Sequence, residues 1–189
     1  MFSRNYQLTH DIDWFCLING VSIHAASNGG LLPNKYCSTS ELRGIQQMVN
    51  GLDENFEYGI NRNIEIQSNP YLEDLGQDFY YYFPETIGLF DDIPLTNSQK
   101  AYYWSFVKMA KKGFFSFDRS KKSNAYNLVA WPKCFIYGEN KMIPLLKDVT
   151  YTCDIITNKR LMYLFYKLRQ NNLSLNLVEK LNKSSKVEK

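Results

Sequence analysis

Apolar and polar residues alternate on both sides of an Asn19-Gly20 pair, and this pattern predicts a β-hairpin over residues 11–28. A two-residue turn at this pair fixes the strand register, because Ile18 must then face Val21. The register puts Trp14 on an apolar face, which we expect to be buried. The opposite face carries the polar side chains Asp11, Asp13, Ser22, His24 and Asn28.

Two helices are predicted where a capping box precedes apolar residues at helical spacing. The first has its capping box at residues 38–41 and an apolar stripe over residues 42–52. The second has its capping box at residues 96–99, and Gly113 is its expected end. The apolar stripe of this second helix consists of Tyr103, Phe106, Val107 and Ala110.

Shorter elements are expected in the rest of the chain. One or two strands are predicted within residues 56–67, and a further strand at residues 78–83 that Pro84 ends. Two hairpins are predicted, one from residues 114–118 and 126–131 and one from residues 133–137 and 141–145. Residues 148–156 predict a last strand, a helix begins near Thr157, and Ser174 caps a short final helix.

These elements predict an α+β fold, with a mixed, mostly antiparallel sheet built from hairpins and three or four helices. No regular alternation of strand and helix is present, which argues against a parallel α/β sheet. No long Gly, Pro or Ser linker divides the chain, so we expect a single domain over residues 1–181. The polar residues 182–189 are an expected frayed tail.

Composition indicates a globular protein of the reducing cytoplasm. Hydrophobic residues make up 44% of the 189 residues and aromatic residues 15%, which is enough apolar surface for a core. No apolar run approaches the roughly 20 residues of a membrane-spanning helix. The four cysteines form no CxxC pair, and with only two histidines they predict neither a zinc site nor a cofactor.

The polar face of the first hairpin is the first candidate site, with Asp11, Asp13, His24 and Asn28 as candidate catalytic residues. Diagonal neighbours across two strands lie about 7–8 Å apart, so Asp13 and His24 can meet. A histidine beside carboxylates can transfer protons in general acid–base catalysis. The alternative is a polar strand face that is simply exposed to solvent.

The second candidate site follows from an uneven distribution of charge. Residues 1–100 carry 5 Lys/Arg and 13 Asp/Glu, whereas residues 101–189 carry 17 Lys/Arg and 6 Asp/Glu. Basic and aromatic residues alternate around the second helix and the hairpin after it, as they do in many nucleic-acid-binding proteins. The candidate nucleic-acid-binding residues are Lys108, Lys111, Lys112, Arg119, Lys121 and Lys122. Alternatively, the basic half neutralises the acidic half within the fold.

Three functions therefore compete. The first is a non-enzymatic interaction protein whose basic half contacts nucleic acid or another acidic macromolecule. The second is a small enzyme that uses the Asp/His/Asn face of the first hairpin. The third is a protein inhibitor or immunity-type protein whose acidic half, including Asp53, Glu54, Asp91 and Asp92, binds a basic target. The sequence leaves the oligomeric state open.

Overall fold

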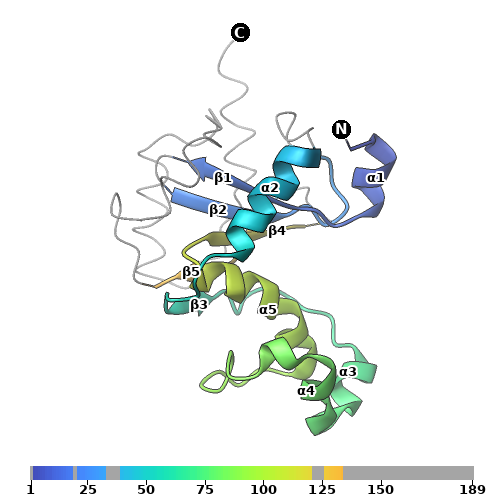
Figure 1. Cartoon of the computed structure of the whole chain (residues 1–189). Helices are drawn as coiled ribbons and strands as arrows, with labels where there is room; N and C mark the ends of the chain where they lie inside the picture. The colour runs from blue at the N-terminus through green and yellow to red at the C-terminus, as the bar shows by residue number, and fades with distance from the viewer. Residues whose placement is uncertain (1, 19–20, 33–38, 121–125, 134–189) are drawn as a thin grey trace.

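The computed structural model describes residues 2–18, 21–32, 39–120 and 126–133 (Figure 1). Its strands are β1 (Asp13–Ile18), β2 (Val21–Ala26), β3 (Tyr58–Ile60), β4 (Phe115–Arg119) and β5 (Tyr126–Pro132). Its α-helices are α1 (Arg4–Thr9), α2 (Thr39–Asn50), α3 (Pro70–Asp74), α4 (Phe79–Tyr82) and α5 (Asn97–Lys111). Two 3₁₀ turns, η2 (Gly76–Asp78) and η3 (Pro84–Thr86), lie on either side of α4. The described part thus has the predicted α+β class.

The first hairpin has the predicted register. Trp14 pairs with Ala25 and Ile18 with Val21, as a two-residue connection requires. Asp13 and His24 consequently project from the face opposite Trp14. The Trp14 side chain is buried, and its indole N–H donates a hydrogen bond of 3.3 Å to the hydroxyl of Tyr126 on β5.

The five strands form one mixed sheet in the order β1-β2-β4-β5-β3. Three of the four strand pairs are antiparallel, as predicted, and β2 and β4 form the parallel pair. Residue 118 of β4 is thereby brought beside residue 26 of β2, although the two are 92 positions apart in the chain. This pairing has the largest consequence for the candidate site.

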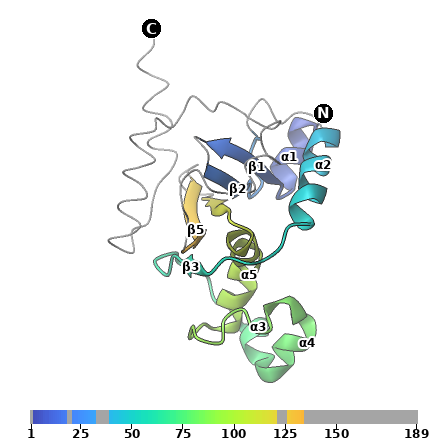
Figure 2. The ribbon, with the colours of Figure 1, turned by 60° about the vertical axis from the view of Figure 1, so that its left-hand side comes forward.

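Helix α5 forms because its capping box and apolar stripe agree. The Thr96 hydroxyl accepts from the backbone N–H of Gln99, and the Gln99 side chain accepts from the backbone N–H of Thr96. Gly113 follows the helix at φ +92°, a conformation that glycine adopts without steric cost. The four residues of the predicted stripe are all buried. In Figure 2 this helix runs from the sheet toward α3 and α4.

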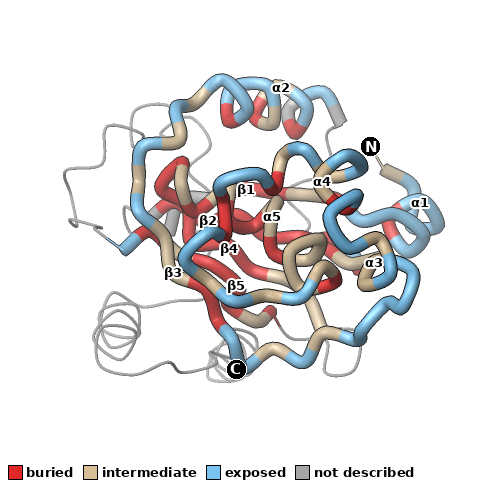
Figure 3. Tube along the Cα trace, turned by 90° about the horizontal axis from the view of Figure 1, so that it is seen from below, coloured by how far each residue is buried: buried red, intermediate tan, exposed pale blue. Residues whose placement is uncertain are grey.

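The sheet is buried on both faces, which corrects one expectation. His24 was predicted on a polar face, but only 1% of its surface is exposed, and Ser22 and Phe15 on the same face are also buried. Helix α5 covers this face, and the Phe106 ring lies 6.0 Å from the His24 ring. The burial map in Figure 3 shows buried segments of the sheet beside α5 at the centre of the molecule.

The predicted strand at residues 78–83 is wrong, because this segment forms η2 and α4. Aromatic residues favour strands mainly when a neighbouring strand offers a surface to pack against. Among the described residues, no strand of the sheet pairs with this segment. Instead, the rings of Phe79 and Phe83 stack at 4.7 Å, the contact that residues four positions apart make in a helix. Helix α1, which Ser3 caps, was not predicted.

Several predictions lie outside the described residues. They include the Asn19-Gly20 turn itself, the Ser38 cap, the second hairpin beyond Lys133, the last strand, and the helices after Thr157. The domain boundary at residue 181 and the tail also stay predictions. Within the described ranges, none of the helices combines the length and the apolar character needed to cross a membrane.

Candidate functional site: an acidic pocket between the sheet and helix α5

A pocket of about 410 Å³ opens where β1, β2 and β4 meet α5. Asp13, Ala26 and Asp118 form its back wall and lie in one row across the three strands. Neighbouring strands are about 4.8 Å apart, so the α-carbons of the two aspartates are about 10 Å apart with Ala26 between them. Because alanine has so small a side chain, the space between the two carboxylates is left open.

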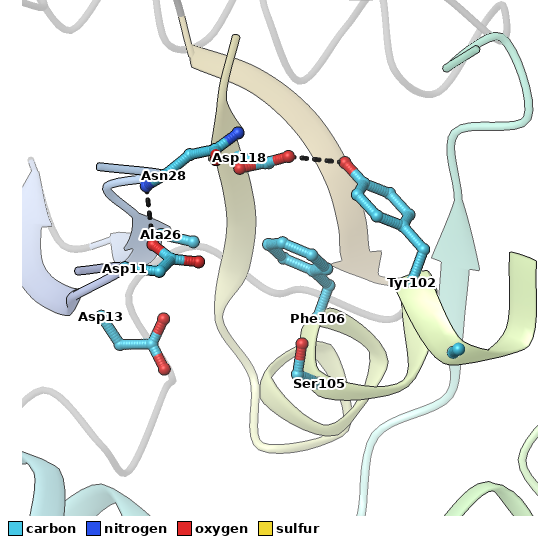
Figure 4. A pocket seen from close by; sticks show the side chains of 9 residues that line it. Asp11, Asp13, Ala26, Asn28, Tyr102, Ser105, Phe106 and Asp118 are labelled. Atoms are coloured by element: carbon cyan, nitrogen blue, oxygen red, sulfur yellow. Dashed lines mark hydrogen bonds between the residues drawn. The ribbon is translucent and has the colours of Figure 1, made fainter. Parts of the chain in front are cut away.

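Figure 4 shows the side chains that surround this space. Asp11, Asp13 and Asn28 come from the first hairpin and its flanks, and Asp118 comes from β4. Helix α5 contributes the facing wall with Ala101, Tyr102, Ser105 and Phe106. Among the described residues that line the pocket, three are aspartates and none is lysine or arginine. The pocket is therefore suited to a ligand that is positively charged or donates hydrogen bonds.

Asp13 is held from inside the protein by a buried histidine. The His24 Nε2 atom lies 3.2 Å from Oδ1 of Asp13, while 47% of the Asp13 side chain is exposed. On its other side, His24 Nδ1 lies 2.6 Å from the hydroxyl of Ser116 on β4. Burial raises the pKa of Asp13, but the close contact with His24 and its charge outweigh burial and hold this pKa below its ordinary value.

Ser116, His24 and Asp13 have the residue types of a hydrolase triad, but their arrangement is reversed. In a working triad the serine faces the substrate and the aspartate is buried. Here Ser116 has no exposed surface, and Asp13 is the member that reaches the pocket. The three residues therefore do not form a serine nucleophile, and His24 acts on the pocket only through Asp13.

Asp118 has a different environment from Asp13. The Tyr102 hydroxyl donates a hydrogen bond of 2.8 Å to Oδ2 of Asp118. Burial raises the pKa of Asp118 to about 6, with a further contribution from the negative charge of Asp11, although the Tyr102 hydrogen bond opposes the shift. Burial and the Asp118 charge also raise the pKa of Tyr102, which stays protonated as the donor. Asp118 can thus gain and lose a proton close to neutral pH.

Asp11 and Asn28 line the pocket and also hold its edge in place. The Asp11 carboxylate accepts from the backbone N–H of Asn28 at 2.6 Å. Asn28 has a φ of 45°, a left-handed conformation that asparagine tolerates better than most residues. Its side-chain amide donates to the carbonyl of Arg119 at 2.8 Å, which ties the end of β2 to the end of β4.

Sequence reasoning found part of this pocket. Asp11, Asp13 and Asn28 line it as a group, and His24 contacts Asp13 from behind. Asp118 and the α5 residues Tyr102 and Ser105 were missed as site residues. The alternation within each hairpin identifies faces, but it contains no information about which strand lies beside β2. Within the described part, no three histidine, cysteine or acidic side chains are grouped so that they could hold a metal ion.

The described basic residues that were predicted to bind nucleic acid each contact a different part of the protein. A lysine that binds nucleic acid must be exposed, but Lys112 is buried, and its Nζ donates to the carbonyls of Val49 at 3.1 Å and Asn50 at 3.0 Å. It thereby satisfies carbonyls at the C-terminal end of α2, which have no partner within the helix. Burial lowers the pKa of Lys112.

Other members of this group have different surroundings. Lys111 Nζ lies 3.8 Å from the Glu54 carboxylate, and Lys108 Nζ lies 5.4 Å from the centre of the Trp104 ring. The Arg119 side chain lies beside the backbone of Gly30. Lys121 and Lys122 lie outside the described residues, so nucleic-acid binding by this half of the chain stays a prediction.

Comparison of the chain with protein-family models, curated proteins and solved structures gave no match. The candidate function therefore depends on the geometry of the pocket.

Proposed function

We propose that the acidic pocket is the active site of a small enzyme that acts on a ligand carrying a cationic group, such as an amine. The observation that carries this proposal is the row Asp13–Ala26–Asp118, in which two carboxyl groups with different partners face one open space. Active sites commonly hold two carboxyl groups in environments that separate their roles. The row thus offers one anionic anchor and one group for proton transfer.

Asp13 is the anchor. Its contact with His24 favours the ionised carboxylate, so it presents a negative charge over most of the pH range in which proteins function. Half of its side chain is exposed, which leaves room for a ligand cation to approach. Asp11, with its carboxylate at the same pocket, adds to the negative potential.

Asp118 is the proton-transfer group. A carboxyl group with a pKa of about 6 exchanges protons near neutral pH more effectively than one with the ordinary value. Tyr102 fixes its orientation through the 2.8 Å hydrogen bond, and the Ser105 side chain lines the same pocket from α5. The chemistry that this supports is general acid–base catalysis, with the proton passing between Asp118 and the bound ligand.

A test can use a small-molecule extract of the native host, incubated with the protein and followed by mass spectrometry. The expected result is that the wild-type chain consumes one or more amine-containing compounds. Asp118→Asn should leave them unchanged, since the amide cannot exchange a proton as a carboxyl group does. Ala26→Leu is a second variant, because the larger side chain fills the space between the carboxylates. Consumption that is equal in all three proteins, or absent in all, contradicts the proposal.

Binding can be separated from catalysis with the compounds that such an experiment identifies. Asp118→Asn should still bind them, as measured by calorimetry, because Asp13 and Asp11 remain. Asp13→Asn should bind at least tenfold more weakly, because it loses the anchoring charge. Unchanged binding by Asp13→Asn would show that the cation is held elsewhere.

A further inference from the structure

A second surface lies away from the pocket, on the helical lobe formed by residues 69–95. This lobe holds α3 and α4 with the two 3₁₀ turns, and Figures 1 and 2 show it at the far end of α5 from the sheet. It exposes large aromatic and aliphatic side chains, which are more often buried in a protein core. They are Tyr71 at 64% exposure, Tyr81 at 82%, Tyr82 at 57% and Ile87 at 64%.

The lobe is held firmly enough to present these side chains in fixed positions. Phe79 is fully buried, and Leu89 and Phe90 join the core cluster that contains Tyr103 and Phe106 of α5. The Glu73 carboxylate accepts two backbone N–H groups from the first turn of α5, one from residue 97 and one from residue 98, each at 3.0 Å. Rigid aromatic side chains lose little conformational entropy on binding, so this exposure suits an interface.

The charge of the lobe selects the kind of partner. The chain has no lysine or arginine from residue 63 to residue 99, whereas the lobe itself carries six acidic residues. Asp74, Asp78, Asp91 and Asp92 are exposed among them. Such a surface repels phosphate groups and attracts lysine and arginine side chains. Nucleic acid and anionic membranes are therefore poor partners for it.

The lobe already binds one cation of its own chain through aromatic rings. The Lys100 ammonium lies 4.9 Å from the centre of the Tyr80 ring, and it donates a hydrogen bond of 2.8 Å to the Tyr80 hydroxyl. The neighbouring Tyr81 and Tyr82 pack edge to face at 5.3 Å and offer similar rings to solvent. Aromatic faces attract ammonium and guanidinium groups, and tyrosine is enriched at protein interfaces.

We propose that the helical lobe is a docking surface for a partner protein that presents a segment rich in lysine and arginine. Tyr81 and Tyr82 contact the cationic side chains of that segment, and the exposed aspartates surround them. This proposal is independent of the proposed enzyme activity, because the lobe contributes no described residue to the acidic pocket.

The experiment places a photo-crosslinking amino acid, p-benzoylphenylalanine, in the full-length chain inside its native host. One variant carries it at Tyr82 and a control carries it at Tyr6, an exposed tyrosine of α1. The expected result is a partner crosslinked from position 82 and not from position 6, through a segment with an excess of lysine and arginine. Crosslinks that do not differ between the positions would overturn the proposal, as would crosslinks to a neutral or acidic segment, to nucleic acid, or to a second copy of this chain.

The purified partner then tests the residues. Tyr81→Ala/Tyr82→Ala and Asp74→Lys/Asp78→Lys should each weaken its binding at least tenfold, and added salt should weaken binding by the wild-type chain. Tyr6→Ala and Ala26→Leu should bind as the wild type does. Thermal unfolding must show that the variants are folded. Affinity that the lobe variants leave unchanged would overturn the proposal, even if the pocket variants abolish enzyme activity.

Discussion

The Nε2 atom of His24 lies 3.2 Å from Oδ1 of Asp13, and this contact joins a fully buried ring to a carboxylate that lines the acidic pocket. The contact affects both residues, but their surroundings differ. His24 is enclosed by Phe15, Phe106 and Ser116, whereas Asp13 retains access to solvent. Changes at the two positions therefore have different consequences for stability and for the pocket.

His24→Ala should lower the melting temperature clearly. The change leaves a cavity under α5 and removes the partner of the buried Ser116 hydroxyl, so we expect a loss of about 2–4 kcal/mol in the free energy of unfolding. Chemical denaturation of the wild type and the variant measures this loss. Asp13→Asn is the matched control, because it keeps the size of a half-exposed side chain and should cost much less. A His24→Ala variant as stable as the wild type would contradict the observed burial.

The same contact predicts a pH dependence. Because the folded-state pKa of Asp13 lies below its ordinary value of 3.8, its ionised form stabilises the fold above that value, and this contribution is lost as the pH falls through the lowered pKa. In His24→Asn the pKa of Asp13 should rise, since the histidine charge is gone. Carboxyl-carbon NMR titration of both proteins measures the change. If the pKa of Asp13 is the same in both proteins, a group other than His24 lowers it.

For Asp118 we expect the opposite dependence of folding stability on pH. Its pKa is raised from 3.8 to about 6, so the folded state holds this proton more tightly, and ionisation between these values destabilises the fold as the pH rises. Asp118→Asn should therefore increase stability at pH 7.5 by about 1 kcal/mol while it abolishes turnover. The gain should vanish near pH 4. Melting temperatures of both proteins across this range provide the test, and a variant that is less stable at pH 7.5 speaks against the raised pKa.

Lys112 and Lys108 belong to the same helix region but should respond differently to mutation. Lys112→Ala removes the side-chain donor to the carbonyls of residues 49 and 50, of which residue 49 still accepts from the backbone N–H of residue 52, and we expect a loss of about 1–3 kcal/mol in unfolding free energy. Lys108→Ala removes a contact with the Trp104 ring and should cost less than about 1 kcal/mol. Denaturation curves for the two variants decide the point, and equal losses would argue against a capping role for Lys112.

Glu73 links the helical lobe to α5, and its charge matters for that link. Hydrogen bonds from Ser98 and from neighbouring groups of the α5 first turn hold the pKa of Glu73 below its ordinary value of 4.5. Its ionised form thus stabilises the fold above that value, and the contribution disappears as the pH falls through the lowered pKa. Glu73→Gln should cost about 1 kcal/mol at pH 7 and almost nothing once the pH lies well below the lowered pKa. A loss independent of pH would show that its charge is unimportant.

Local sequence patterns predicted the elements that local chemistry determines. The Asn19-Gly20 pair indicated the register of the first hairpin, and the capping box at Thr96 and Gln99 indicated where α5 begins, because each depends on residues only a few positions apart. Helix α4 could not be recognised in this way. Its aromatic residues suit a strand or a helix, and whether another strand lies beside them depends on residues that are distant in sequence.

The sequence predicted only those residues of the candidate site that belong to the first hairpin and its flanks. Asp11, Asp13 and Asn28 follow from that hairpin, whereas Asp118 joins them through the parallel pairing of β2 and β4. Periodicity describes which way a side chain points from its own strand, but the neighbour of that strand depends on the packing of the whole sheet. The burial of His24 was missed for a related reason, because its cover is supplied by α5.

The way the helical lobe joins the domain bears on how the protein can change over evolutionary time. The backbone N–H of Asn69 donates to the Ser98 hydroxyl at 2.8 Å, so the chain leaves the domain and returns to it at nearly the same point. A segment whose two ends meet can be lengthened, shortened or exchanged at its exposed residues while the remaining chain keeps its path, provided that Leu89 and Phe90 keep their places in the core. Thr96 and Gln99 would still begin α5 after such an exchange, because their reciprocal hydrogen bonds use no residue of the lobe. The surface that we propose for docking can therefore diverge between related proteins while the sheet and the acidic pocket stay unchanged.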